Sequence, residues 1–229
     1  MAGRRHFTLE LFDFLAELAD NNTREWFAAN RDRYRAQVQE PLLRFIADFA
    51  APLRAISPAF VADPRPSGGS MFRIHRDVRF SRDKSPYKTH AAAQFRHRGG
   101  RDAHAPGFYL HLEPGNVFAA AGSWHPDREH LDRIRAEIFE HPREWRSVLA
   151  DRVFAAHHHL AGDSLVRAPR GFDPDHPLIE DLKRKDFIAV EALSQSAACR
   201  AGFIDRVAQS FAAAAPLVRF LTEAQGQEF

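Results

Sequence analysis

The hydrophobic pattern of this chain changes its period at about residue 72. Before that point, apolar side chains recur every three or four residues, as they do along one face of a helix. Between residues 72 and 122 they recur every second residue, which is the period of a strand with one buried face. Short turns separate these runs, and a short turn forces neighbouring strands to run antiparallel. The pattern therefore predicts an antiparallel sheet with helices before and after it.

The predicted sheet contains four strands in sequence order, over residues 72–80, 88–96, 108–113 and 117–122. The first two are expected to pair as a wide hairpin, because residues 81–86 carry the Asp, Ser and Pro of a turn. Residues 187–193 are β-branched and aromatic enough to form an additional strand. We expect an α+β fold, with an antiparallel meander of four to five strands and N-terminal and C-terminal helices packed on one face.

The chain is expected to form a single α+β domain over residues 1–229. Helices are predicted within residues 1–56, and short helices alone would leave their aromatic faces exposed, so this part should pack on the sheet of residues 71–124. Residues 127–229 are predicted to be mostly helical, apart from the additional strand at 187–193. An apolar content of 45%, with twenty Phe, is sufficient for one large core.

The sequence favours a cytoplasmic protein. No signal-peptide run follows Met1, and no apolar stretch approaches the roughly 20 residues of a membrane span. Cys199 is the only cysteine, which excludes an internal disulfide. We therefore expect no membrane contact.

Basic residues are concentrated in Met71–Arg98, which holds eight Lys or Arg and three His but only two acids. The whole chain has a net charge of only +2, so any preference for anions must come from this clustering. Arginine grips phosphate or carboxylate at two points, and lysine adds a point charge. We predict a site for a small anionic ligand on the polar sheet face, with these candidate residues: Arg73, Asp77, Arg79, Lys84, Lys88, His90, Arg96, Tyr109 and His111.

The same face would also carry His75, Gln94 and Glu113. Surrounding cations should lower the pKa of Asp77 and keep it ionised, which argues against a role as general base. His90 or His111 could donate a proton to a phosphoryl or carboxylate substrate, because histidine titrates near neutral pH. The sequence assigns no catalytic residue.

Other interpretations of these residues remain open. His75, His90 and His111, with Asp77 or Glu113, are ligand types that suit zinc or ferrous iron, but nearby Arg and Lys would repel a dication. The adjacent His157–His159 would point in different directions. We therefore expect neither a metal nor another cofactor.

A nucleic-acid partner is disfavoured, because the strands lack an aromatic platform beyond Tyr87 and Tyr109 and the total charge is low. A structural interpretation also stands, in which Arg76 and Asp77 tie the wide turn of residues 81–87 to the sheet as part of an ion-pair network. In that case the helices would form a partner surface.

The segment RIHRDVRFSRDKSPYKTH, residues 73–90, resembles the signature of a family called domain of unknown function 2461. Further segments agree with it, namely NNTREWFAANRDRYRAQVQEPL, GFYLHLEP, GSWHP and LVRAPRGFDPDHPLIEDLKRKDF. The resemblance implies a single-domain α+β protein whose biochemical role is unassigned. The matching positions are Arg73, Arg76, Asp77, Arg79, Phe80, Lys84, Pro86, Tyr87, Lys88, His176, Pro177, Leu182 and Lys183. The resemblance also implies that His75, Gln94 and His97 are particular to this chain.

Overall fold

The computed structural model describes residues 4–100 and 104–229 and contains a six-stranded antiparallel sheet. The strand order is β1-β2-β3-β4-β6-β5. The strands are β1 (Phe60–Val61), β2 (Ala91–His97), β3 (Gly107–Glu113), β4 (Asn116–Ser123), β5 (His159–Ala161) and β6 (Phe187–Leu193). The predicted α+β class is confirmed, but the sheet has six strands rather than four to five. The edge strands β1 and β5 are too short to produce a recognisable alternation.

The helices lie before, between and after the strands. Their bounds are α1 (Leu9–Asp20), α2 (Arg24–Ala29), α3 (Arg31–Tyr34), the π-helical turn η1 (Arg35–Gln39), α4 (Glu40–Ile56), α5 (Arg128–Glu140), α6 (Pro142–Ala150), α7 (Arg152–His157), α8 (Ile179–Leu182), α9 (Gln195–Ala198) and α10 (Phe203–Glu223). Within the described ranges, no helix combines the length and apolar character needed to cross a membrane.

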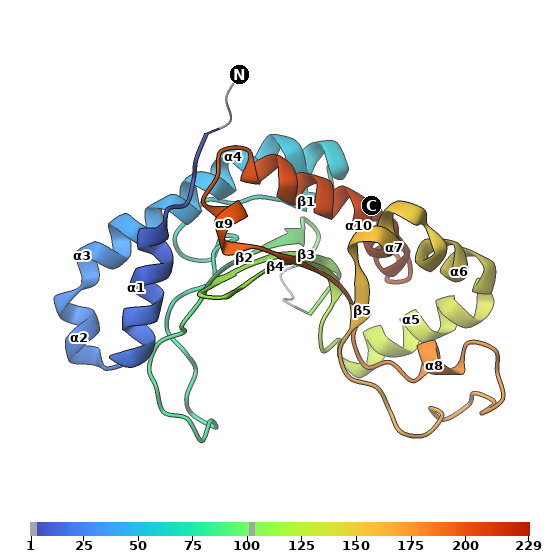
Figure 1. Cartoon of the computed structure of the whole chain (residues 1–229). Coiled ribbons are helices and arrows are strands. Elements are labelled where there is room, and N and C mark those ends of the chain that lie inside the picture. Colours follow the sequence, from blue (N-terminus) through green and yellow to red (C-terminus); the bar gives the residue numbers. More distant parts are fainter. Residues whose placement is uncertain (1–3, 101–103) are drawn as a thin grey trace.

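One face of the sheet is covered by helices and the other is open (Figure 1). The covered face carries the apolar half of each alternation, including Phe95 opposite Phe108, and it packs against α4 and α10. Phe211 of α10 contacts both of these rings and Phe49 of α4, at centroid separations of 4.9 to 5.8 Å. The open face carries the other half, so the register of the strands decides which side chains can reach a ligand.

The helix α10 connects two apolar clusters. Its first half joins the cluster beneath β2, β3 and β4, to which α1 and α4 also contribute. Its last turns carry Leu217, Phe220 and Leu221 into a second cluster formed with α5, α6 and β6, where Trp145 is fully buried. One helix therefore ties the N-terminal and C-terminal parts of the chain to the same sheet.

The predicted strand over residues 72–80 was wrong. The segment pairs with β2 and the residues before it only at isolated positions, Met71 with Ala93 and His75 with Tyr87. This pairing preserves the predicted hairpin near its base, but beyond Arg76 the chain forms an irregular loop, and Phe80 is 96% exposed. Among the residues that the structure describes, no helix covers that part of the chain (Figure 1), so the apolar side of the alternation is not buried in a core there.

Candidate functional site

A pocket of about 650 Å³ lies on the open face of the sheet. Its floor is formed by residues of β3, β4 and β6 that point to the open face. Its walls come from the segment before β2 and from Trp124, which follows β4. Such a volume is in the range of pockets that hold a small molecule. The lining residues include Phe72, Lys88, His90, His104, Tyr109, His111, Phe118, Ala120, Gly122, Trp124, Ile188 and Val190.

The pocket exists because small side chains stand in the middle of the sheet. Ala120 and Gly122 of β4 face it, between Tyr109 of β3 and the paired positions Val190 and Ile188 of β6. Gly122 has φ +125, and a Cβ there would lie 1.9 Å from the carbonyl oxygen of Phe187. A larger residue cannot occupy this position without moving β6 away from β4. The small residues of β4 therefore allow this strand to pair closely with β6 and leave space for the pocket above them.

The polar end of the pocket is organised by alternate residues of β3. The Tyr109 hydroxyl lies 2.9 Å from Nδ1 of His111, and Nε2 of His111 lies 3.2 Å from a carboxylate oxygen of Glu113. Since a carboxylate only accepts hydrogen bonds, Nε2 donates to Glu113 and Nδ1 accepts from Tyr109. The His111 ring also stacks on Phe118, at 4.5 Å between centroids. These contacts fix both the tautomer and the orientation of the imidazole.

The carboxylate of Glu113 accepts further hydrogen bonds, in addition to the one from His111. Thr89 donates a hydrogen bond to one carboxylate oxygen at 3.2 Å, and the side-chain amide of Asn116 donates to the other at 3.0 Å. Burial alone would raise the pKa of Glu113, but these hydrogen bonds and His111 lower it below its ordinary value. Glu113 is therefore an oriented carboxylate beside the pocket.

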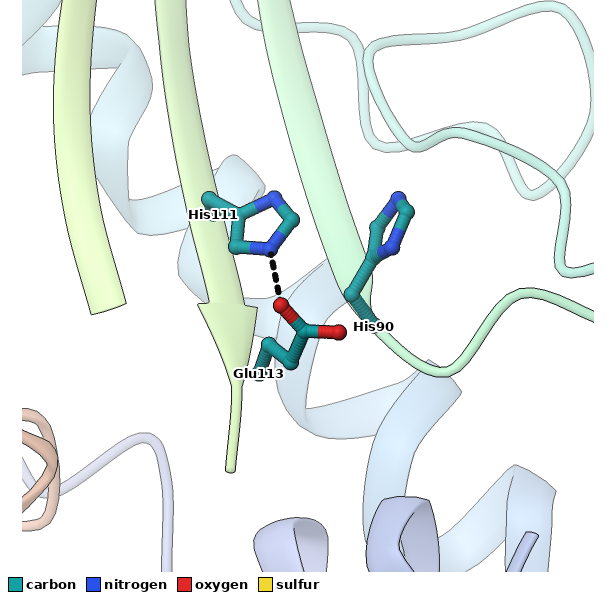
Figure 2. Close-up of side chains that lie close together, drawn as sticks. All are labelled: His90, His111 and Glu113. Carbon is teal, nitrogen blue, oxygen red and sulfur yellow. Dashed lines mark hydrogen bonds and ion pairs between the residues drawn. The ribbon is translucent and has the colours of Figure 1, made fainter. Parts of the chain in front are cut away.

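His90 completes this end of the pocket from the segment just before β2 (Figure 2). Its ring lies 4.5 Å from that of His111, between centroids. Burial lowers the pKa of His90 to about 4, and the neighbouring His111 and Lys88 act in the same direction. Burial also lowers the pKa of His111, against the effect of Glu113. Both imidazoles are consequently neutral at pH 7.

Among the described residues, Lys88 is the cation that lines the pocket, and Arg96 lies near the Phe72 ring, which also lines it. The Lys88 ammonium is 4.9 Å from the centre of the Phe72 ring, and the Arg96 guanidinium lies 5.9 Å from the same centre. Burial lowers the pKa of Lys88, and so does the charge of Arg73. No carboxylate of residues 4–100 or 104–229 forms an ion pair with Lys88, Arg73 or Arg96.

The remaining predicted ligand residues lie in the exposed loop of residues 77–85, away from the pocket lining. Asp77 pairs with Arg79 at 2.7 Å, and this hydrogen bonding, with nearby positive charge, lowers its pKa to about 2, as predicted. Lys84 donates to the carbonyl of Val78, and Arg76 pairs with Asp83 across the loop. The structure therefore brings together Lys88, His90, Tyr109 and His111, but not Asp77, Arg79 or Lys84.

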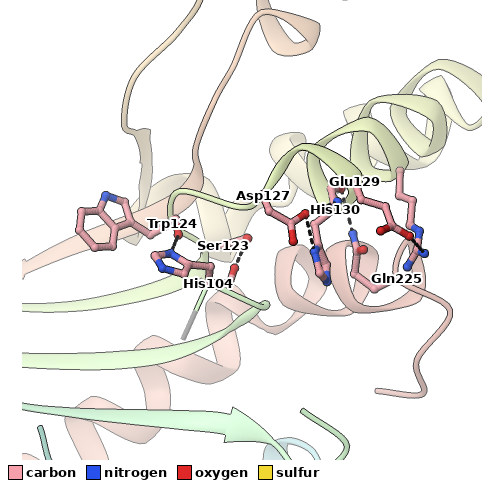
Figure 3. A network of polar contacts seen from close by, with 8 residues as sticks. His104, Ser123, Trp124, Asp127, Glu129, His130 and Gln225 are labelled. Atoms are coloured by element: carbon pink, nitrogen blue, oxygen red, sulfur yellow. Dashed lines mark hydrogen bonds and ion pairs between the residues drawn. The ribbon is translucent and has the colours of Figure 1, made fainter. Parts of the chain in front are cut away.

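The far rim of the pocket is set by the segment that follows β4 (Figure 3). Nδ1 of His104 lies 2.8 Å from the carbonyl of Trp124, and Ser123 donates to the carbonyl of His104. His125 adopts φ +49 and donates its backbone NH to the buried Asp186. Asp127 then caps α5 through the NH of His130. These contacts fix the backbone around Trp124, whose side chain lines the pocket.

The apolar part of the site was missed by the sequence analysis, which treated the open face as a surface of polar donors. Phe118, Ile188, Val190 and Trp124 line it, and β6 lies about seventy residues beyond β4 in the chain. The run of small residues in β4 was the only local signal for a hollow floor. The pairing that makes it a pocket is long-range and leaves no mark in the local pattern.

Comparison with known proteins gives a single family. A family model described as "Conserved hypothetical protein (DUF2461)" matches residues 10–220. No curated protein and no solved structure matches the chain significantly. The match covers the whole sheet and every residue that lines the pocket.

Proposed function

The chain belongs to the DUF2461 family, and because the description of that family names no activity, we propose a function from the pocket itself: it binds a small molecule that joins an apolar body to a carboxylate or phosphate group. The apolar body would lie on the floor of β4 and β6, and the anionic group would face Lys88. The apolar end of the ligand would thus contact the apolar part of the pocket, and its charged end the basic part.

This proposal rests on a difference between two groups of basic residues, those that pair with acids and those beside the pocket that, among the described residues, do not. Two arginines of the segment away from the pocket are paired with acids, Arg79 with Asp77 and Arg76 with Asp83. Lys84 of the same loop donates to the carbonyl of Val78 instead. The cations beside the pocket have no such partner among the described residues, although Lys88 is partly buried. A partly buried charge is costly unless it is compensated, and an anionic ligand group would compensate it.

A structural function is proposed for the loop of residues 77–85 itself. Asp83 holds Arg76 and also accepts hydrogen bonds from the backbone and side chain of Ser85, while the backbone of Arg76 donates to Pro86. At the base of the loop, the side chain of Asn22 accepts from and donates to the backbone of Tyr87. These contacts position Lys88 and His90, so much of the basic motif shapes the site without touching the ligand.

The proposal is tested with four probes on the wild-type chain: 1-naphthyl phosphate, 1-naphthoate, 1-naphthol and inorganic phosphate. At ten times its Kd, a ligand stabilises the native state by about 1.4 kcal/mol, which raises Tm by roughly 3–6 °C for a domain of this size. We expect such a rise with one or both of the naphthyl anions, and a smaller one with the neutral naphthol and with inorganic phosphate. The absence of any rise with both naphthyl anions would refute the proposal.

A further inference from the structure

Three side chains of metal-binding type converge at the polar end of the pocket. His90, His111 and Glu113 each offer one ligand atom, and these atoms all lie within 4.8 Å of one another (Figure 2). The 3.2 Å between His111 Nε2 and Glu113 Oε2 already matches the separation of two ligands bound tetrahedrally at about 2.0–2.2 Å from zinc. We propose that His90, His111 and Glu113 bind a divalent transition-metal ion of the zinc class.

The surroundings of these residues resemble an outer coordination shell. A metal-bound histidine usually donates its second ring NH to a fixed acceptor, and a metal-bound carboxylate is usually hydrogen-bonded. Tyr109 stands 2.9 Å from Nδ1 of His111 and can accept from it once Nε2 binds the metal. Thr89 and Asn116 hold the carboxylate of Glu113. The two ligands on β3 are thus oriented before any ion arrives.

His90 is the ligand that has to move. Within the described part of the chain, its ring makes no hydrogen bond, and its contact with His111 is between rings at 4.5 Å. A rotation about its side-chain torsions would bring a ring nitrogen closer to His111 and Glu113, and no hydrogen bond of the His90 ring among the described residues would have to break. His90 therefore completes the site at little energetic cost.

The structure shows which basic residues lie close enough to the three proposed ligands to repel a metal ion. Arg79 and Lys84 belong to the exposed loop, whereas Lys88 and Arg76 remain near enough to His90 to lower its pKa. These two charges weaken binding of a dication, and the carboxylate of Glu113 opposes their effect. Two imidazoles and one carboxylate form the three-ligand set that leaves a coordination position open.

The open coordination position of the ion would point into the pocket. His90 and His111 both line the pocket, whereas Glu113 is not among the residues that line it. An oxygen of a carboxylate or phosphate in the pocket could therefore bind the ion while the same group faces Lys88. This last step rests on the proposed function, whereas binding of the ion does not.

The experiment uses the full chain, purified without a polyhistidine tag, stripped with a chelator and titrated with Zn²⁺ or Co²⁺ alone. We expect one ion per chain and the visible absorption of Co²⁺ in a site of low coordination number. Glu113→Gln and His90→Ala should each weaken Zn²⁺ binding by more than the roughly 10–100-fold that loss of an outer-shell partner costs. His159→Ala, in the exposed end of the 157–159 histidine tract, is the matched control and should leave the affinity unchanged.

Unchanged zinc affinity in both site variants, or no zinc binding by the wild-type chain, overturns the proposal. Circular dichroism checks that each variant is folded. Nitrogen NMR of histidine-labelled wild-type protein decides independently of the variants, because Zn²⁺ should shift the ring nitrogens of two histidines, and shifts confined to other histidines would overturn the assignment. The naphthyl anions are tested on the metal-free chain. The proposed anion binding and the proposed metal binding can therefore fail independently of each other.

Discussion

His111 and Glu113 stand two residues apart on one face of β3, with Nε2 of the first 3.2 Å from a carboxylate oxygen of the second. Residues i and i+2 of a strand point the same way, so the strand itself holds this pair in register. Tyr109 extends the row by two residues in the other direction and contacts Nδ1 of the same imidazole. Three successive same-face positions of one strand therefore supply an oriented histidine with a fixed group at each ring nitrogen.

Replacing Tyr109 by Phe removes only the hydroxyl group that faces Nδ1 of His111. Loss of an outer-shell partner typically weakens metal binding by 10–100-fold, so we expect Tyr109→Phe to raise the Kd for Zn²⁺ by about tenfold or more. Competition with a chromophoric chelator measures this change. Tyr34→Phe is the control, because Tyr34 is buried beside Phe14 and Phe27 in the helical core. Equal affinities in the two variants would contradict the role given to Tyr109.

Ala120 offers a way to fill the pocket without disturbing the core. It faces the cavity from β4, opposite Tyr109 and Val190. We expect Ala120→Phe to weaken binding of 1-naphthyl phosphate at least about tenfold, since each buried CH₂ of the displaced ligand contributes about 0.8 kcal/mol. Isothermal titration measures the change, with Ala192→Phe on the exposed part of β6 as the matched control. A ligand that binds both variants equally well does not occupy this cavity.

The two apolar clusters should unfold together, because α10 belongs to both. Phe211→Ala in one cluster and Trp145→Ala in the other should each lower the free energy of unfolding by about 3–5 kcal/mol and shift the same single transition. Denaturant unfolding followed by fluorescence and by circular dichroism gives this result. Phe80→Ala removes an exposed ring and should change stability little. Two separate transitions in either core variant would show that the chain contains two domains.

Glu191 should make the protein sensitive to acid. It is buried on the covered face of β6, where it pairs with Arg206 and with His157 at 3.0 Å, close to His158 and Ser210. Burial would raise its pKa, but the nearby Ser210 hydroxyl and the hydrogen bond and charge of Arg206 lower it below the ordinary value.

A lowered pKa in the folded state gives stability that is complete above the unfolded pKa and is lost as the pH falls through the folded one. The urea midpoint of the wild-type chain should therefore fall more steeply below about pH 4.3 than that of Glu191→Gln. Parallel curves for the two proteins would show that Glu191 contributes nothing to acid stability.

The sequence predicted the regular part of the sheet well. In β3, β4 and β6 one buried face alternates with residues of the other face, and each of these strands was expected within about one residue of its observed bounds. The alternation of residues 72–80 was just as clear, yet no strand forms beyond the isolated bridges. Alternation reports which side chains could be buried, but a strand also needs a partner edge, and β1 already takes part of the edge of β2.

The same limit applies to the candidate site. Lys88, His90, Tyr109 and His111 were predicted because they lie on or beside strands whose register the pattern fixes. Arg79 was grouped with them as part of the expected first strand, and Lys84 as a charge from the turn after it. Local bonds to Asp77 and to Val78 instead hold both side chains in the loop. The apolar floor depends on β6 pairing with β4, a contact between distant parts of the chain that no local pattern encodes.

The most direct test of the proposed ligand site compares two lysines of the same basic motif. Lys88 lies at the pocket wall, and Lys84 lies in the exposed loop, where it donates to the carbonyl of Val78. Isothermal titration of wild type, Lys88→Met and Lys84→Met with 1-naphthyl phosphate separates their roles. A hydrogen bond to a charged group contributes about 1.5–3 kcal/mol, so Lys88→Met should weaken binding roughly 10–100-fold, while Lys84→Met should match wild type. Equal Kd values for the two variants, or a greater loss in Lys84→Met, would contradict the assignment of the pocket as the ligand site.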